Sequence, residues 1–173
     1  MLSNFDLENL ASFYKLPLIG IFMKNEMPTK PVNGCYIINI QSSTQGNGTH
    51  WTALFIWKKI SYYFDSFGAP PPNEIILFSK KKKGGHLLYN NWIIQDLKSE
   101  ACCWYCLGFL LYMWKNRQNI NMKEVFNQFV NNFQDDTLRN DEILRHFFSK
   151  TYGIKVPTLL KKFIERIKCL YCI

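Results

Sequence analysis

The stretch CCWYCLGFLLYMW, residues 102–114, is the most apolar run of the chain and decides its fold. It is too short to cross a bilayer, which takes about 20 residues. It is also hydrophobic nearly all round, as is typical of a helix buried on every side. We therefore expect one central helix, capped by Ser99 and beginning at Glu100, with the rest of the chain packed around it.

Two strand-like runs precede this helix, at residues 51–57 and 60–65. Only Lys58 and Lys59 separate them, which predicts a hairpin with a two-residue turn. The register of such a hairpin pairs Thr52 with Asp65 and leaves His50 diagonally beside the carboxylate. Diagonal neighbours lie about 7–8 Å apart, so the two side chains can meet.

The remaining elements follow from local signals. Ser3 and Asp6 can cap a short amphipathic helix, and the proline-containing stretch 17–31 is expected to be mostly irregular. Residues 35–40 and 86–95 are expected to form strands, and residues 41–48 and 79–86 exposed loops. Further helices are predicted from Asn121, over about 136–150 and over 158–168.

Composition points to a single domain over residues 1–173. Hydrophobic residues make up 47% of the chain and aromatic residues 16%, which argues against disorder because burial can offset the ordering entropy. The formal charge of +8 favours encounters with polyanions such as nucleic acid. Six cysteines without a visible secretory signal indicate free thiols in a reducing compartment, and no segment indicates membrane insertion.

Cys102 lies in the first turn of the expected central helix. There the helix dipole favours an anion and lowers the pKa of a thiol. Glu100 in the same turn opposes this effect, so a cationic neighbour is needed to make the thiolate dominant. A histidinium is the usual one, and His50 is the candidate.

The order of His50, Asp65, Gln95 and Cys102 resembles that of the adenovirus-type cysteine endopeptidases, the adenain family. The motifs that carry the resemblance are GTHW (48–51), YYFDSFG (62–68) and QDLKSEACCWYC (95–106). The resemblance covers about residues 1–115 and leaves 116–173 as a helical C-terminal portion. In style the chain looks closest to the members found in virophages and self-synthesising DNA transposons.

The resemblance implies a papain-like α/β (α+β) fold of the adenain/Ulp1 type. Its nucleophile helix packs on a mixed β-sheet, with additional helices towards the C-terminus. Cys102 would attack the scissile carbonyl, His50 would move the proton and Asp65 would orient the imidazole. Gln95 would donate its side-chain amide to the oxyanion, and Trp51 would flank the site and contact substrate.

One position departs from the family pattern. The family has glycine directly after the nucleophile, whereas this chain has Cys103. This leaves open the local geometry and even which cysteine attacks. The spacing from Gln95 and the match of Cys106 to the family's second cysteine favour Cys102.

The resemblance further implies that the substrates are viral capsid precursors, cleaved at Gly-Gly-type sites in the virion and the host cytoplasm. The chemistry requires no metal or other cofactor, and DNA and a small viral peptide are candidate activators. The protein is expected to be a monomer. Basic residues that are candidates for nonspecific DNA contact, or equally for solvated faces, are Lys80, Lys81, Lys82, Lys83, Lys161, Lys162, Arg166 and Lys168.

Three other functions remain open. A ubiquitin-like-protein-specific (deSUMOylase-type) protease shares the fold and the residue order. Cys103 and Cys106 form a C-x-x-C motif that suits a thiol redox or zinc protein, for which Cys169 and Cys172 are the remaining candidate ligands. A non-catalytic virion or DNA-binding protein that has kept the fold is the third.

Overall fold

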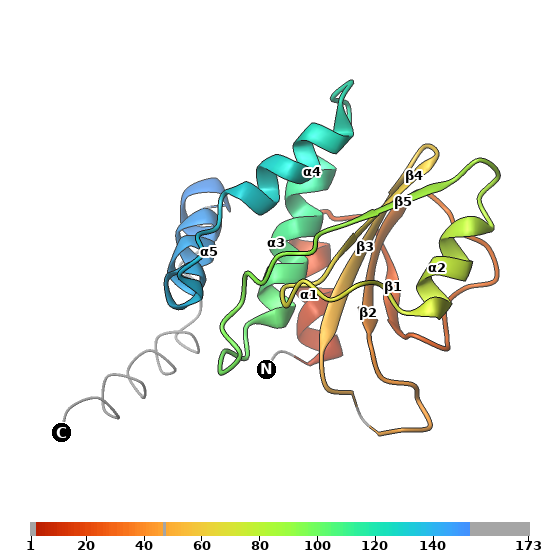
Figure 1. Cartoon of the computed structure of the whole chain (residues 1–173), viewed down its shortest axis with the longest axis horizontal. Helices are drawn as coiled ribbons and strands as arrows, with labels where there is room; N and C mark the ends of the chain where they lie inside the picture. The colour runs from red at the N-terminus through yellow and green to blue at the C-terminus, as the bar shows by residue number, and fades with distance from the viewer. Residues whose placement is uncertain (1–2, 47, 153–173) are drawn as a thin grey trace.

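The computed structural model describes residues 3–46 and 48–152, and in them a five-stranded mixed sheet lies between helices on both faces (Figure 1). The strands are β1 (Leu18–Met23), β2 (Gly34–Asn39), β3 (Trp51–Trp57), β4 (Ile60–Phe64) and β5 (His86–Tyr89). The helices are α1 (Asn4–Phe13), α2 (Asn73–Lys80), α3 (Cys102–Lys115), α4 (Met122–Asn131) and α5 (Thr137–Tyr152). This arrangement confirms the α/β prediction.

The strands lie in chain order across the sheet. The two central pairs, β2 with β3 and β3 with β4, are antiparallel, whereas β1 and β5 join the two edges as parallel strands. The β3–β4 hairpin has the predicted two-residue turn at Lys58 and Lys59, with Ala53 opposite Phe64. The turn begins with Lys58 at a φ of 55°, the left-handed conformation that such turns require.

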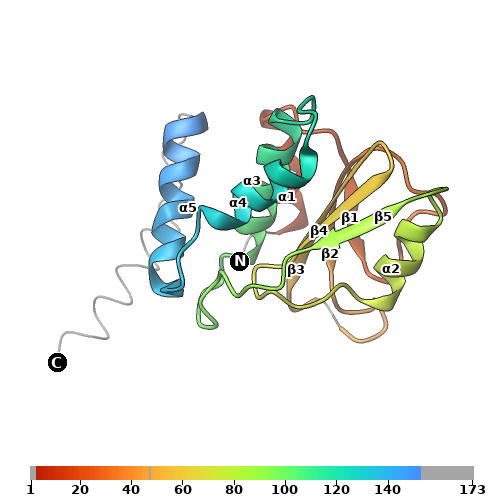
Figure 2. The same ribbon diagram turned by 45° about the horizontal axis from the view of Figure 1, so that its top comes forward.

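Alternation along the strands produces two separate cores. Cys35, Ala53 and Phe55 point to the face covered by α1 and α3, and their neighbours point to the face covered by α2. Because both faces are buried, β2 and β3 are apolar almost throughout rather than alternately polar. Figure 2 shows the resulting layers, with α3 between the sheet and α5, and α2 on the opposite face.

The apolar run 102–114 forms α3, and eleven of the fourteen residues of this helix are buried. Its start differs from the prediction, because the helix begins at Cys102 rather than Glu100. Ala101 occupies the N-cap position without a side-chain cap. The Ser99 hydroxyl donates to Asp141, 42 residues further along the chain, at 2.7 Å, and accepts from the Ala101 N–H at 3.3 Å.

One stretch predicted as mostly irregular contains a strand, and a helix forms in a segment for which no element is predicted. Residues 18–23 form edge strand β1, whose register shifts near Gly20, and residues 73–80 form α2 directly after three prolines. The loop predicted for 79–86 is therefore shorter. The strand predicted for 86–95 ends at Tyr89, after which the chain runs without helix or strand as far as Ala101.

The other helix predictions are confirmed where the structure describes them. Ser3 and Asp6 form a capping box on α1, and Asn121 caps α4 through the backbone of Glu124. The helix expected over 136–150 is α5. The helix predicted over 158–168 lies outside the described residues. No described helix is both long and apolar enough to span a membrane.

Candidate active site

The hairpin brings His50 and Asp65 together at one end of the sheet. His50 directly precedes β3 and Asp65 directly follows β4, so the antiparallel pairing puts both at the same edge. The Nε2 atom of His50 lies 2.8 Å from Oδ1 of Asp65, and both side chains are buried. The backbone N–H of Phe67 also donates to this carboxylate oxygen, at 2.8 Å. The imidazole therefore has a fixed, anchored acidic partner.

Asn90 fixes the backbone of Asp65. It lies just after β5, where its Oδ1 accepts from the Asp65 N–H at 3.0 Å and its Nδ2 donates to the Asp65 carbonyl at 2.7 Å. The same Nδ2 contacts the carbonyl of Trp92 at 3.3 Å. Asn90, just after the parallel edge strand, thus clamps Asp65 by hydrogen bonds to both its N–H and its carbonyl.

The residues after Asp65 shape the other side of the imidazole. Phe67 stacks on the ring of His50, with centroids 4.5 Å apart and planes at 27°. Gly68 has a φ of 69°, and a Cβ there would lie 2.6 Å from the backbone of Trp92. Only glycine fits this position without displacing the backbone. The stacking of Phe67 on His50 and the close approach at Gly68 together explain the Phe-Gly pair of the FDSFG segment.

Cys102 is the first residue of α3 and forms a hydrogen bond with His50. Because Nε2 of His50 is engaged by Asp65, Nδ1 is the ring nitrogen left for the sulfur. Burial lowers the pKa of His50, but its hydrogen bonds with Asp65 and Cys102 and their charges outweigh burial and raise it. The sulfur therefore has a protonated neighbour at neutral pH.

The pKa of Cys102 is lowered well below that of an ordinary thiol. A hydrogen bond from Cys103 contributes most, and hydrogen bonds from His50 and the Trp51 backbone add to it, while burial opposes them. The result is a thiolate–imidazolium pair, the reactive form of a cysteine nucleophile.

The three thiols of this helix start have different surroundings. Cys103, which stands where the adenovirus-type endopeptidases have glycine, is fully buried and stabilises the Cys102 thiolate. The thiol of Cys106 donates to the carbonyl of Trp51 at 3.2 Å, and burial raises its pKa well above the usual value. Of the thiols whose pKa shift is resolved in this turn, Cys102 is the one whose surroundings favour the thiolate.

Gln95 lies in the loop between β5 and α3, fully buried beside this site. Its Oε1 accepts from the hydroxyl of Ser66 at 2.7 Å, and its Nε2 donates to the carbonyl of Ser99 at 2.6 Å. The amide nitrogen carries two N–H groups, and the Ser99 carbonyl takes one of them. Its role as oxyanion donor stays a prediction.

The other predicted residues occupy varied surroundings. Trp51 is buried in the main core beside Cys102, and its role towards substrate stays a prediction. Lys81 donates to the Thr29 carbonyl and Lys82 to the Asn33 side chain, while Lys80 and Lys83 are exposed. Lys161, Lys162, Arg166 and Lys168 lie outside the described residues, as do Cys169 and Cys172.

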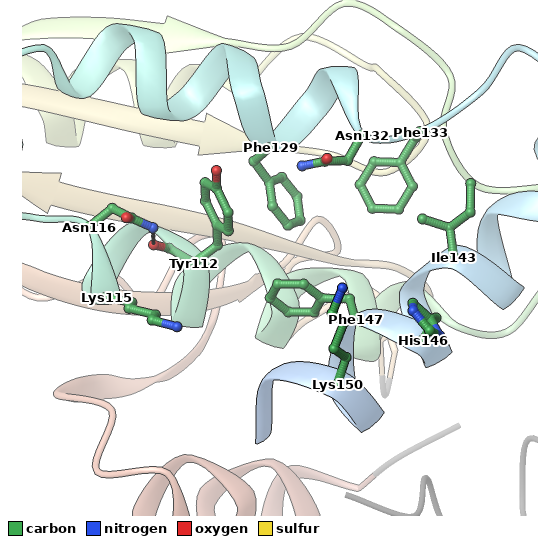
Figure 3. Close-up of a pocket in the computed structure, with 10 residues that line it drawn as sticks. All are labelled: Tyr112, Lys115, Asn116, Phe129, Asn132, Phe133, Ile143, His146, Phe147 and Lys150. Carbon is green, nitrogen blue, oxygen red and sulfur yellow. Dashed lines mark hydrogen bonds between the residues drawn. The ribbon is translucent and has the colours of Figure 1, made fainter. Parts of the chain in front are cut away.

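A separate cavity of about 490 Å³ lies between α3, α4 and α5, away from the His50–Cys102 pair (Figure 3). Aromatic side chains, among them Phe129 and Phe147, form much of its wall, and Lys115, His146 and Lys150 supply basic groups. In the described part of the chain, no three His, Cys, Asp or Glu side chains cluster closely enough to hold a metal ion. The four cysteines described there are free thiols.

Sequence reasoning missed the residues that support the site. Ser66 and Phe67 lie inside the FDSFG segment next to Asp65, and this adjacency to a candidate acid was an available signal. Asn90 and the α5 residues Asn140 and Asp141 carry no such local signal, because their partners are distant in the chain.

Comparison with known proteins gives a likeness in fold. No known family profile matches the sequence, and no curated protein sequence matches it. The crystal structure of the ASFV pS273R protease is similar, with a TM-score of 0.52 and 19% sequence identity over 88% of this chain and 66% of that one. The selenomethionine form of the same protease gives a TM-score of 0.47 and 19% identity over 90% of this chain and 68% of that one.

This chain therefore spans just under two thirds of the length of the first of these structures. At 19% identity the likeness concerns the fold, and it confirms the predicted papain-like arrangement of the adenain/Ulp1 type. The nucleophile-bearing helix packs on a mixed sheet, with additional helices following it in the chain.

Proposed function

We propose that this chain is a cysteine endopeptidase whose nucleophile is Cys102. The observation that carries the proposal is the contact of the Asp65 carboxylate with His50 Nε2 at 2.8 Å, together with the hydrogen bond between the same imidazole and the Cys102 sulfur. The opposite pKa shifts of thiol and imidazole support it, because they favour the ion pair that a thiol protease needs.

In the proposed mechanism the Cys102 thiolate attacks the scissile carbonyl carbon and the carbonyl oxygen becomes an oxyanion. The free N–H of Gln95 and the backbone N–H of Cys102 donate to that oxygen. The His50 imidazolium then protonates the leaving amine, which departs as the new N-terminus and leaves a thioester. Neutral His50 next takes a proton from water, the hydroxide attacks the thioester, and Cys102 leaves as thiolate. Asp65 orients the ring throughout.

Viral precursor proteins cut at Gly-Gly-type sites are the proposed substrates. The motif resemblance to adenovirus-type endopeptidases and the similarity in fold to the ASFV protease support this class. Burial adds a physical reason, since Cys102 is only 3% exposed and His50 only 7%. Residues without side chains reach a sulfur held so deeply with the least displacement of the surrounding protein.

The organisation of the protein is proposed as one domain acting as a monomer in the virion and the host cytoplasm. DNA and a small viral peptide are the proposed activators. The exposed Lys80 and Lys83 and the net charge of +8 support contact with nucleic acid, of a nonspecific and salt-sensitive kind.

The proposal is tested by incubating the full chain with candidate structural precursors and a Gly-Gly reporter peptide, with and without DNA. Mass spectrometry of the new termini should show cleavage after glycine, and Cys102→Ala should abolish it. Cys106→Ala serves as the matched control, because it removes a buried thiol from the same helix turn. Cleavage that persists in Cys102→Ala would contradict the assignment of Cys102 as the nucleophile.

A SUMO-type conjugate in the same assay separates the second candidate. The chain order His50, Asp65, Gln95 and Cys102 favours a ubiquitin-like-protein-specific protease as much as a viral one. Release of the conjugated protein without cleavage of the viral precursors would assign the activity to that class instead.

A further inference from the structure

The loop that carries Gln95 lies between the end of β5 and the start of α3 and contains no helix or strand. Within the loop, the backbone N–H groups of Ile94 and Gln95 both donate to the Ser66 carbonyl, at 2.8 and 2.9 Å. The Gln95 side chain is held between the Ser66 hydroxyl and the Ser99 carbonyl. A regular ladder does not fix this loop, so its position depends on individual contacts.

Asn140 of α5 supplies one of these contacts. It is fully buried, and its Nδ2 donates to the carbonyl of Ile94 at 2.8 Å. The same carboxamide bonds to both the N–H and the carbonyl of Gln134 at 2.8 Å, which fixes its orientation. Helix α5 thereby holds the residue directly before Gln95.

Asp141, the next residue of α5, holds the other end of the loop. Its Oδ2 accepts from the hydroxyl of Ser99 at 2.7 Å and its Oδ1 accepts from the hydroxyl of Tyr105 at 2.8 Å. The Ser99 carbonyl is the acceptor for the Gln95 amide. In Figures 1 and 2 the N-terminal end of α5 lies beside the segment that leads into α3, as these contacts require.

We infer that Asn140 and Asp141 are positioning residues that set the direction of the Gln95 amide. One N–H of that amide is bound to Ser99, so the place of Ser99 and Ile94 determines where the second N–H points. An oxyanion donor acts only when it lies about 2.7–3.1 Å from the charge that develops. The inference rests on the proposed function, in which Gln95 is that donor, and it gives α5 a role in positioning the site.

The test compares Asn140→Ala and Asp141→Ala with Leu144→Ala in the full chain. Leu144 lies one turn further along α5, is buried and packs against Gly108 of α3, so its truncation weakens the docking of α5 without touching the loop. Three readouts are taken: kcat and KM on a Gly-Gly peptide, the inhibition constant of a peptide aldehyde, and the rate of alkylation by iodoacetamide.

The aldehyde adduct carries an oxyanion, whereas alkylation requires only the thiolate–imidazolium pair. For Asn140→Ala and Asp141→Ala we expect kcat to fall by about tenfold and aldehyde affinity to fall in proportion, since removing a donor outright costs about 10²–10³. KM and the alkylation rate should change by less than about twofold. A parallel fall in alkylation, or an equal loss of kcat in Leu144→Ala, overturns the inference.

A double variant shows whether Asn140 acts through Gln95. In a Gln95→Ala background the further substitution Asn140→Ala should lower kcat by less than about twofold, because the group it positions is absent. The full tenfold loss in that background would mean that Asn140 acts by another route, and would overturn the inference.

Hydrogen exchange separates this inference from the proposed activity. Amides of residues 95–101 should exchange about tenfold faster in Asn140→Ala than in the unaltered chain, and much less so in Leu144→Ala. If the unaltered chain cleaves nothing, proteolysis fails as a function while faster exchange still supports the positioning role. Unchanged exchange in Asn140→Ala overturns the positioning role whatever the activity.

Discussion

The Nε2 atom of His50 and the Oδ1 atom of Asp65 lie 2.8 Å apart, although the two residues are 15 positions apart in the chain. Their contact follows from the hairpin register, because one residue precedes β3 and the other follows β4. Asn90 clamps the backbone of Asp65 from β5, and Phe67 covers the imidazole. The sheet therefore positions His50 and Asp65, whereas the thiol of Cys102 comes from helix α3.

Asp65→Asn should retain the shape of this pair but lose its charge. Without the carboxylate, the imidazolium form of His50 loses one of the interactions that raise its pKa. We expect kcat/KM on a Gly-Gly peptide to fall by about 100-fold or more, as for a triad that loses its orienting acid. Circular dichroism should show an intact fold. Activity within a few fold of the unaltered chain would contradict the role of Asp65.

The pH dependence of the nucleophile should be bell-shaped. The thiolate exists above the pKa of Cys102, at about 5, and the imidazolium exists below the pKa of His50, at about 9. The ion pair is therefore present between these limits, with an acid limb near the first and an alkaline limb near the second, and both belong to the pair as a whole. The kcat/KM for a Gly-Gly peptide across this range measures both limbs, because the imidazolium must protonate the leaving amine, whereas alkylation by iodoacetamide measures the acid limb alone. An alkylation rate that rises only at about pH 8.5, as for an ordinary thiol, would speak against the pair.

Cys103→Ala should move the acid limb of this profile to higher pH. The hydrogen bond from Cys103 is the largest of the interactions that lower the pKa of Cys102, so its removal should raise that pKa. Cys106→Ala, which deletes a thiol bonded to the Trp51 carbonyl, is the matched control and should shift the limb much less. If both variants keep the original limb, Cys103 does not assist the nucleophile.

The parts of the fold that were predicted correctly are those with local signals. The two residues between the strand-like runs predicted the register of the β3–β4 hairpin, and the uninterrupted apolar run 102–114 predicted α3. The parallel edge strands have no such signal, because each pairs with a neighbour that is not joined to it by a turn. The sequence therefore predicts no strand at β1, and it predicts a strand over 86–95 where β5 ends at Tyr89.

Long-range contacts explain the remaining differences. Ser99 looks like a helix cap in the sequence, but its hydroxyl donates to Asp141 of α5, and α3 begins only at Cys102. Helix α2 starts immediately after Pro72, and its buried residues Ile75, Phe78 and Ser79 have helical spacing that the adjacent prolines and lysines obscured. The candidate catalytic residues were recognisable from their order and motifs, whereas the groups that hydrogen-bond to them or to their chain neighbours lie in elements that only folding brings together.

Two glycines with almost the same backbone conformation offer a matched test of the turn after Asp65. Gly68 and Gly84 have φ values of 69° and 70°, but a Cβ at Gly68 would lie 2.6 Å from the Trp92 backbone, whereas a Cβ at Gly84 would meet nothing within 4 Å. Gly84→Ala should therefore cost only the conformational penalty of about 1–2 kcal/mol in the free energy of unfolding.

Gly68→Ala carries the same penalty and must also displace the backbone that holds Asn90 and Trp92. We expect a loss of about 3 kcal/mol or more in urea unfolding, and a kcat/KM lower than that of Gly84→Ala at equal folded fraction. The activity difference is the informative part, because moving Trp92 also moves the clamp on Asp65. Equal stability and equal activity in the two variants would show that the close approach at Gly68 is not needed to hold the acid in place.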